Sequence, residues 1–129
     1  MLLLDTHFLL WILVGASRLE EFPWLVDHQP WAVSPVSLLE IQFLAEAGRL
    51  EVDSAALVAA IGQDARFVTD DLSLSVVIDQ ALPFPWTRDP FDRLLVGHSV
   101  ARRLPLCTVD RLIRRYHPYL PDPLRPTRP

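Results

Sequence analysis

The stretch that decides the fold is MLLLDTHFLLW, residues 1–11, in which an apolar run meets a single acidic side chain. Residues 1–4 are continuously apolar, which is typical of a short strand buried on both faces of a parallel sheet. A helix is expected to follow at once over residues 6–14. Asp5 then either merely ends a buried strand, or the strand serves to hold Asp5 in place. Because both flanks of Asp5 look buried, the second interpretation is favoured.

Downstream of this stretch, apolar strands alternate with helices. Further strands are expected at residues 31–34, 66–68 and 104–108, and helices at residues 35–47, 54–61, 70–79, 91–103 and 110–116. Such alternation predicts an α/β domain with a parallel sheet, in which sites form at the carboxyl ends of the strands.

Caps and breakers set the expected helix ends. Ser34 and Asp89 each precede a proline, an arrangement that supplies an N-cap and a first helical residue. Thr69 is expected to cap the helix over residues 70–79. Gly48 and Gly62 are expected to end the helices before them. The segment from residue 18 to 28 should be kinked, because Pro23 falls inside the helix that a Ser17–Glu20 capping box would open.

Composition limits the class of protein. A chain of 129 residues fits one domain, assigned here to residues 1–118, and five prolines in the last thirteen residues predict an irregular or disordered tail at 119–129. Cys107 is the only cysteine, so an intramolecular disulfide is excluded and a reducing, cytoplasmic location is expected. No stretch has the length of a membrane span, and the N-terminal run is too short for a signal peptide.

Charge and residue choice exclude one kind of chemistry. The net charge of −4 does not indicate nucleic-acid binding, although patches of positive charge remain compatible with it. All twelve basic residues are arginine, which excludes any mechanism that needs a catalytic lysine.

Several acidic residues are expected at one edge of the sheet. Asp5 follows the first strand, Glu40 lies in the helix after the second, and Asp110 follows the strand LPLCT. Asp89 and Asp92 open the helix before that last strand. Carboxylates that converge repel one another unless a cation joins them, and hard oxygen ligands suit Mg²⁺ or Mn²⁺. Such a cluster can activate water for phosphodiester cleavage.

Each acid also has an ordinary structural interpretation. Asp89 and Asp110 are well placed as helix N-caps, and Asp92 would lie in a first turn, where negative charge suits the helix dipole. Glu40 is compatible with a solvated helix position. Only the joint pattern favours a site.

The segments LLLDTHFLLW, VSPVSLLEI and RDPFDRLLVGHSVARRLPLCTVD resemble the PIN-domain toxins of bacterial toxin–antitoxin pairs, of the VapC type, from residue 1 to about residue 116. The resemblance implies a three-layer α/β/α sandwich around a parallel sheet of four to five short strands. It also implies a Mg²⁺- or Mn²⁺-dependent endoribonuclease, a homodimer, and inhibition by a cognate antitoxin protein. Relatives often end in a further strand, which the proline-rich tail makes short or absent here.

The resemblance carries over residue by residue. Asp5, Glu40, Asp92 and Asp110 match the four catalytic, metal-binding acids of the family. Thr6 and Thr108 match hydroxyl positions that orient a carboxylate or a bound water. Asp89 belongs to the RDPFD variant of the motif and is interpreted first as a cap, with a direct role as the alternative.

Other polar residues near these motifs are less specific. Arg88 and Arg93 are candidates for contacts with RNA phosphates, against the alternative of a solvated helix face. His7 is interpreted as structural rather than as a metal ligand, and His98 as packing or surface. The helices over residues 35–47 and 54–61 have wide apolar faces, which the family resemblance suggests clamp the antitoxin and pair two subunits.

Two other functions are compatible with an α/β domain. Phosphoryl transfer through an aspartyl nucleophile also places an Asp after the first strand, but it calls for a lysine, and DTH lacks a second aspartate two residues on. A PIN-fold RNA- or protein-binding module without catalysis is the main alternative. The four matching acids argue against it, because a degenerate member should have lost one or more of them.

Overall fold

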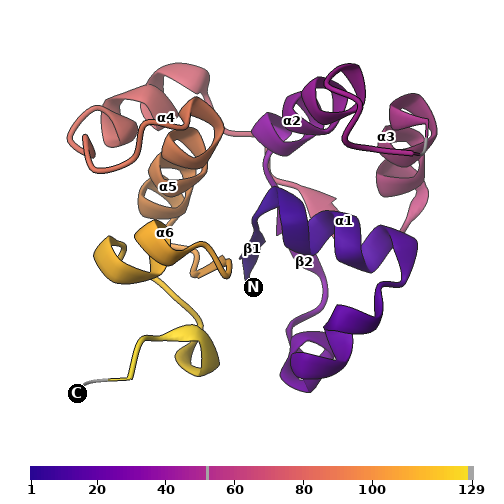
Figure 1. Ribbon diagram of the computed structural model, residues 1–129. Helices are drawn as coiled ribbons and strands as arrows, with labels where there is room; N and C mark the ends of the chain where they lie inside the picture. The colour runs from indigo at the N-terminus through magenta and orange to yellow at the C-terminus, as the bar shows by residue number, and fades with distance from the viewer. Residues whose placement is uncertain (52, 128–129) are drawn as a thin grey trace.

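The computed structural model describes residues 1–51 and 53–127 (Figure 1). Within them four strands form one parallel sheet, with the order β3-β2-β1-β4. The strands are β1 (Leu3–Leu4), β2 (Trp31–Val33), β3 (Phe67–Thr69) and β4 (Leu106–Cys107). Leu3 is paired with Ala32 on one side and with Leu106 on the other. The first strand of the chain therefore lies inside the sheet, as its apolar sequence predicts.

Six helices and three short 3₁₀ segments surround the sheet in the described residues. They are α1 (Thr6–Val14), η1 (Ser17–Glu21), η2 (Pro23–His28), α2 (Pro35–Glu46), α3 (Ser54–Gln63), α4 (Leu74–Ala81), α5 (Pro90–Arg102), α6 (Arg111–Tyr116) and η3 (Asp122–Leu124). The break between η1 and η2 falls directly before Pro23, as expected from its missing N–H. Gly48 has a φ of 73° just after α2, which confirms the predicted helix end.

The sheet is covered on both faces. Leu4 belongs to a core with Phe8 of α1 and Ile41 of α2, whereas the adjacent Leu3 belongs to a second core with Leu95 of α5. Neighbouring residues of a strand point to opposite faces, so the apolar run of residues 2–4 serves both cores, whereas Met1 is exposed. Figure 1 shows α1 to α3 on one side and α4 to α6 on the other. This arrangement confirms the three-layer sandwich.

The fourth helix begins later than the sequence predicts. Thr69 is the last residue of β3, opposite Val33, and the Asp70 N–H donates to Val33 O at 2.8 Å. These residues therefore continue the sheet instead of capping a helix. As a result, α4 begins at Leu74, with Ser73 at the N-cap position.

Two other element ends also differ from prediction. Gly62 does not end α3, which runs on to Gln63, and a helical glycine costs only about 1 kcal/mol relative to alanine. The strand expected from residue 104 begins at Leu106. Its start is delayed because Arg103 takes a left-handed φ of 52° and the Leu104 N–H still donates to Ser99 O in α5.

The described part of the tail packs against the domain. The Leu106 N–H of β4 donates to Tyr119 O at 2.8 Å, and Leu120 and Leu124 are buried. Between α6 and residue 127 there is no strand, as the proline content predicts; the short η3 is the one regular element. The assignment of residues 119–129 to a separate tail stays a prediction.

Among the described residues, no helix is both long enough and apolar enough to cross a membrane.

Candidate active site

One cavity of about 330 Å³ lies beyond the carboxyl ends of β1 and β4. Its lining residues are Asp5, His7, Trp11, Glu40, Asp89, Asp92, Val109 and Asp110. The structure thus brings the four acids named from the sequence together with Asp89. They come from the starts of α1, α5 and α6 and from the middle of α2.

Asp5 is fixed where β1 passes into α1. Its backbone N–H donates to Cys107 O of β4 at 3.0 Å, and its Oδ1 accepts from the Phe8 N–H at 2.9 Å as the N-cap of α1. Only 5% of Asp5 is exposed, and this burial raises its pKa to about 6 despite the Phe8 N–H, which favours the charged form. Asp5 is therefore both a helix cap and an acid with unusual proton affinity.

Glu40 reaches the cavity from α2. Ser34 caps the start of this helix, where its side chain accepts from the Val36 N–H at 3.2 Å. The side chain is buried, and this burial raises its pKa. The Thr6 hydroxyl, which opposes the rise in the pKa of Glu40, donates to Ser37 Oγ at 3.0 Å. Thr6 therefore joins the start of α1 to the helix that carries Glu40.

Asp92 and Asp89 share the first turn of α5. Asp89 Oδ1 accepts from the N–H groups of Phe91 at 2.8 Å and Asp92 at 3.2 Å, so the predicted cap is present. The pKa of Asp92 is raised to about 7, first by burial and then by the negative charges of Asp89 and Asp110. Asp89 therefore acts on the cavity electrostatically, in addition to capping the helix.

Asp110 caps α6 by accepting from the Ile113 N–H at 2.9 Å. Thr108, two residues earlier, is fully buried, and its Oγ1 accepts from the Asp110 N–H at 3.0 Å. The hydroxyl of Thr108 also lowers the pKa of Asp5 and so favours the charged form of that acid. Thr108 therefore affects both the first and the last acid of the site, and its orienting role stays a prediction.

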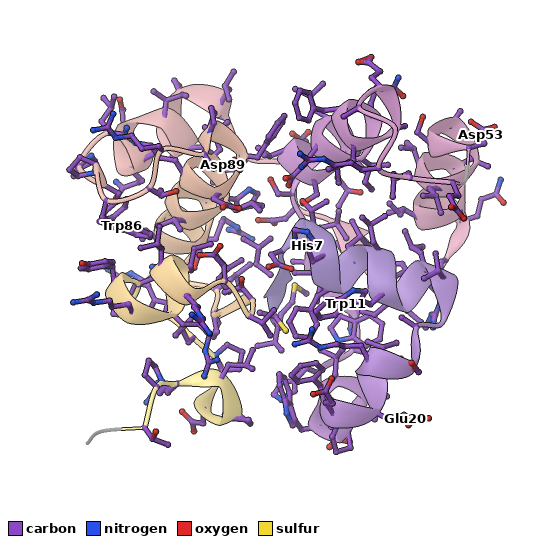
Figure 2. The ribbon with its side chains drawn as sticks, viewed as in Figure 1. His7, Trp11, Glu20, Asp53, Trp86 and Asp89 are labelled. Carbon is purple, nitrogen blue, oxygen red and sulfur yellow. The ribbon has the colours of Figure 1, made fainter. Side chains whose placement is uncertain are left out.

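His7 is a lining residue whose contribution the sequence reasoning underestimated. Figure 2 shows it at the start of α1, with Trp11 further along the same helix and Asp89 across on α5. His7 is exposed, and its positive charge when protonated lowers the pKa of both Asp5 and Glu40. Its position two residues after Asp5 was the available signal.

The two arginines proposed as phosphate contacts do not line this cavity. Arg93 donates from Nε to Ala81 O at 3.0 Å and from Nη2 to Leu82 O at 2.7 Å, at the end of α4. Arg88 is exposed in the loop before α5. Arg93 therefore has a structural partner that its position in the sequence did not indicate.

A buried polar network behind the site was also missed. His98 of α5 is 1% exposed, and its Nδ1 is 3.0 Å from Ser34 Oγ, while its Nε2 is 2.7 Å from Asp70 Oδ2. Arg102 Nε donates to the same oxygen at 2.9 Å. The network ties the end of β2 to α5 and so positions two elements that carry acids. The partners are 28 and 64 residues from His98, too far apart to be recognised as a local pattern.

The donor set suits a hard divalent cation held partly through water. Among the described residues no three His, Cys, Asp or Glu side chains form a ready-made metal centre. Mg²⁺ commonly binds through only one or two carboxylates and keeps several waters, so it does not require such a triad. Besides burial, repulsion from the neighbouring carboxylates raises the pKa of Asp92, and a bound cation would relieve that repulsion.

Comparison with known proteins supports the fold. No family model matches the chain, and no curated protein sequence does either. Among solved structures, the chain is similar to a chain in the crystal structure of VapBC2 from Rickettsia felis bound to a DNA fragment from their promoter. The TM-score is 0.63 at 17% sequence identity, over 92% of this chain and 93% of that chain. At this identity the similarity establishes a shared PIN-like fold.

Proposed function

We propose that this chain is a VapC-like toxin of a toxin–antitoxin pair, acting as a Mg²⁺- or Mn²⁺-dependent endoribonuclease. The observation that carries the proposal is the single cavity onto which Asp5, Glu40, Asp92 and Asp110 converge from four separate elements. The shared fold with a chain of a VapBC complex supports the same assignment. A protein selected only for binding would gain nothing from gathering these acids, because burial raises the pKa of Asp5, Glu40 and Asp92 and so disfavours their charged forms.

The four acids are the residues that would hold the cation. When bound, it would supply an activated water and stabilise the negative charge that develops on the phosphate during phosphodiester hydrolysis. The chain itself contributes rigidity, since Asp5 and Asp110 are each fixed by a backbone N–H that they cap. Thr108 fixes the backbone of Asp110 by accepting from its N–H, and its hydroxyl favours the charged form of Asp5. Preorganised carboxylates lose little freedom when substrate and cation arrive.

An antitoxin and a second subunit are the protein partners we propose. Leu39 and Phe43 of α2 are 64% and 52% exposed, and Phe43 packs against Phe91 at 5.5 Å between ring centroids. This apolar surface lies on the same helix as Glu40. A partner segment covering it would bury apolar area and restrict access to the cavity, which is how an antitoxin would silence the enzyme.

The decisive experiment is RNA cleavage by the purified full chain with Mg²⁺ or Mn²⁺, compared with its Asp5→Asn variant. Asparagine can still accept the Phe8 N–H at the N-cap, so the helix is retained while the charge is lost. We expect cleavage only in the unmodified chain and only with a divalent cation. Undiminished RNA cleavage by Asp5→Asn would show that this cavity is not the active site. A chain that neither cuts RNA nor binds Mn²⁺ at millimolar concentration in calorimetry would instead be a PIN-fold binding module.

A further inference from the structure

A strongly basic surface lies outside the acidic cavity, on α6 and the described tail. We define the arginine surface as Arg111, Arg114, Arg115 and Arg125. Arg111, Arg114 and Arg115 line a cavity of about 410 Å³. Arg114 and Arg115 also line an adjoining cavity of about 490 Å³, together with Arg125. Four of the twelve arginines therefore gather here, although the chain as a whole is acidic.

The arrangement of these arginines follows from the helix. Residues 111, 114 and 115 are spaced i, i+3 and i+4, so their side chains share one face of α6. Arg114 Nε donates to Leu124 O at 2.8 Å, which orders its guanidinium and uses one of its five N–H donors. Arg125 pairs with Asp122 at 3.2 Å, but that aspartate is 85% exposed and offsets only a small part of the positive charge.

The arginine surface begins where the acidic cavity ends. Arg111 directly follows Asp110, which lines that cavity, and α6 then leads away from it. A polyanion whose reacting group lies at Asp110 would therefore meet positive charge along α6. A single small anion does not need two adjoining cavities, whereas a strand with repeated phosphates does.

Aromatic rings lie beside the same arginines. Tyr116 is 48% exposed and stacks on Trp86, with ring centroids 5.5 Å apart and an interplanar angle of 27°. The Arg115 guanidinium lies over the Tyr116 ring, 5.2 Å from its centroid. Figure 2 shows Trp86 next to α6. Aromatic rings and guanidinium planes are the groups on which unpaired bases stack in complexes of proteins with single-stranded RNA.

We propose that the arginine surface binds the phosphate backbone of single-stranded RNA next to the scissile bond, and that the group formed by Trp86, Tyr116 and Arg115 stacks one of its bases. This inference rests on the proposed function for the scissile bond, but it makes a separate claim about binding. The ligand class follows from the pairing of repeated charge with flat π surfaces. An acidic peptide would pair with the positive charge of the arginine surface, but it has no bases to stack on the group formed by Trp86, Tyr116 and Arg115.

The test is RNA binding, measured by fluorescence anisotropy with the full chain in EDTA, so that no cutting occurs. Arg111→Gln/Arg115→Gln removes two exposed charges. The matched control, Arg49→Gln/Arg103→Asn, also removes two exposed charges, and asparagine tolerates the left-handed φ of Arg103. We expect the first double variant to bind a labelled single-stranded RNA on the order of tenfold more weakly. Its log–log salt slope should be shallower by about 1.4 because two phosphate contacts are lost.

The stacking group is tested with Tyr116→Leu and two ligands, single-stranded RNA and inorganic polyphosphate. We expect RNA to bind roughly tenfold more weakly while polyphosphate binding is unchanged, because polyphosphate has no bases. Equal effects on both ligands, or on neither, would overturn the stacking claim. The proposal that the arginine surface binds RNA would be overturned if both arginine double variants lost RNA affinity equally, or if Arg111→Gln/Arg115→Gln lost none.

Failure of the proposed function gives a different result. A chain that binds RNA as described but cuts none would refute the nuclease and leave the binding surface standing. A chain that cuts RNA while Arg111→Gln/Arg115→Gln binds it normally would refute only the binding surface.

Discussion

Asp89 Oδ1 accepts a hydrogen bond from the backbone N–H of Asp92 at 3.2 Å, so a helix cap and a candidate catalytic acid are directly linked. The bond stabilises α5, but it also brings the negative charge of Asp89 near the Asp92 carboxylate and raises its pKa. A residue at this position therefore affects both the stability and the electrostatics of the cavity.

Asp89→Asn should separate those two effects. Asparagine caps helices about as well as aspartate, so the fold should be kept while the charge is removed. We expect the pKa of Asp92 to fall below about 7, yet to stay above its ordinary value because burial is the larger cause. Carboxyl-carbon NMR titration measures this directly.

Asp89→Ala is the matched comparison, since it removes charge and cap together and should cost about 1 kcal/mol of unfolding free energy. An Asp92 pKa that does not move in either variant would contradict the link. Loss of RNA cleavage in Asp89→Asn, with the fold intact, would give Asp89 a direct role at the site.

Asp5→Asn should stabilise the metal-free protein at alkaline pH. The pKa of Asp5 is raised to about 6 in the folded state, so folding favours its neutral form. The contribution of Asp5 to the free energy of unfolding is most favourable below about pH 4, and it is lost as the pH rises through about 6. In urea denaturation at pH 8, we expect the free energy of unfolding of the variant to be higher than that of the unmodified chain by at most about 3 kcal/mol. The difference should vanish near pH 4.

The control for this experiment is Asp53→Asn, at the exposed N-cap of α3, where the side chain accepts from the Ala55 N–H. It should change the unfolding free energy by less than about 0.5 kcal/mol at either pH. A destabilised Asp5→Asn at pH 8 would mean that the charged form of Asp5 is favoured in the folded protein.

Mg²⁺ or Mn²⁺ should raise the thermal midpoint of the unmodified chain, and EDTA should reverse the effect. A cation that binds only the folded state stabilises it by about 2.7 kcal/mol at one hundred times its dissociation constant. Glu40→Gln and Asp92→Asn remove lining carboxylates, so each should reduce the shift. Glu20→Gln is the matched control because Figure 2 places Glu20 well away from His7 and Asp89. An equal shift in all variants would contradict cation binding in the cavity.

The parts of the site that sequence could predict depend on local signals. Asp5 after an apolar strand, and Asp89 before Pro90, are features of neighbouring residues, and the structure has both as helix caps. The convergence of the acids also followed from a general property of parallel sheets, whose carboxyl ends share one edge.

The parts that sequence could not predict depend on contacts between distant segments. Asp70 was expected in a helix, yet its backbone extends the sheet pairing, and its side chain is hydrogen-bonded to His98 of α5. Arg93 looked available for phosphate until α4 supplied two carbonyl acceptors. In each case tertiary partners outweighed local propensity, which amounts to only a few tenths of a kcal/mol per residue.

The glycines of α3 and α5 test how closely the helices pack, because Gly97 lies against α4 in the middle of its helix, whereas Gly62 lies in open space near the end of its helix. A Cβ on Gly97 would lie 2.7 Å from Val77 O and 2.9 Å from Ala81 Cβ in α4, whereas a Cβ on Gly62 meets nothing within 4 Å. Alanine normally stabilises a helix relative to glycine by about 0.5–1 kcal/mol, so Gly62→Ala should gain about that amount. Gly97→Ala should instead lose about 1–3 kcal/mol, because α4 must move away from α5. Urea denaturation of both variants measures the contrast, and a stabilised Gly97→Ala would show that α4 packs less closely against α5 than these distances indicate. Since Arg93 joins α5 to the end of α4, the same displacement should also weaken its two hydrogen bonds.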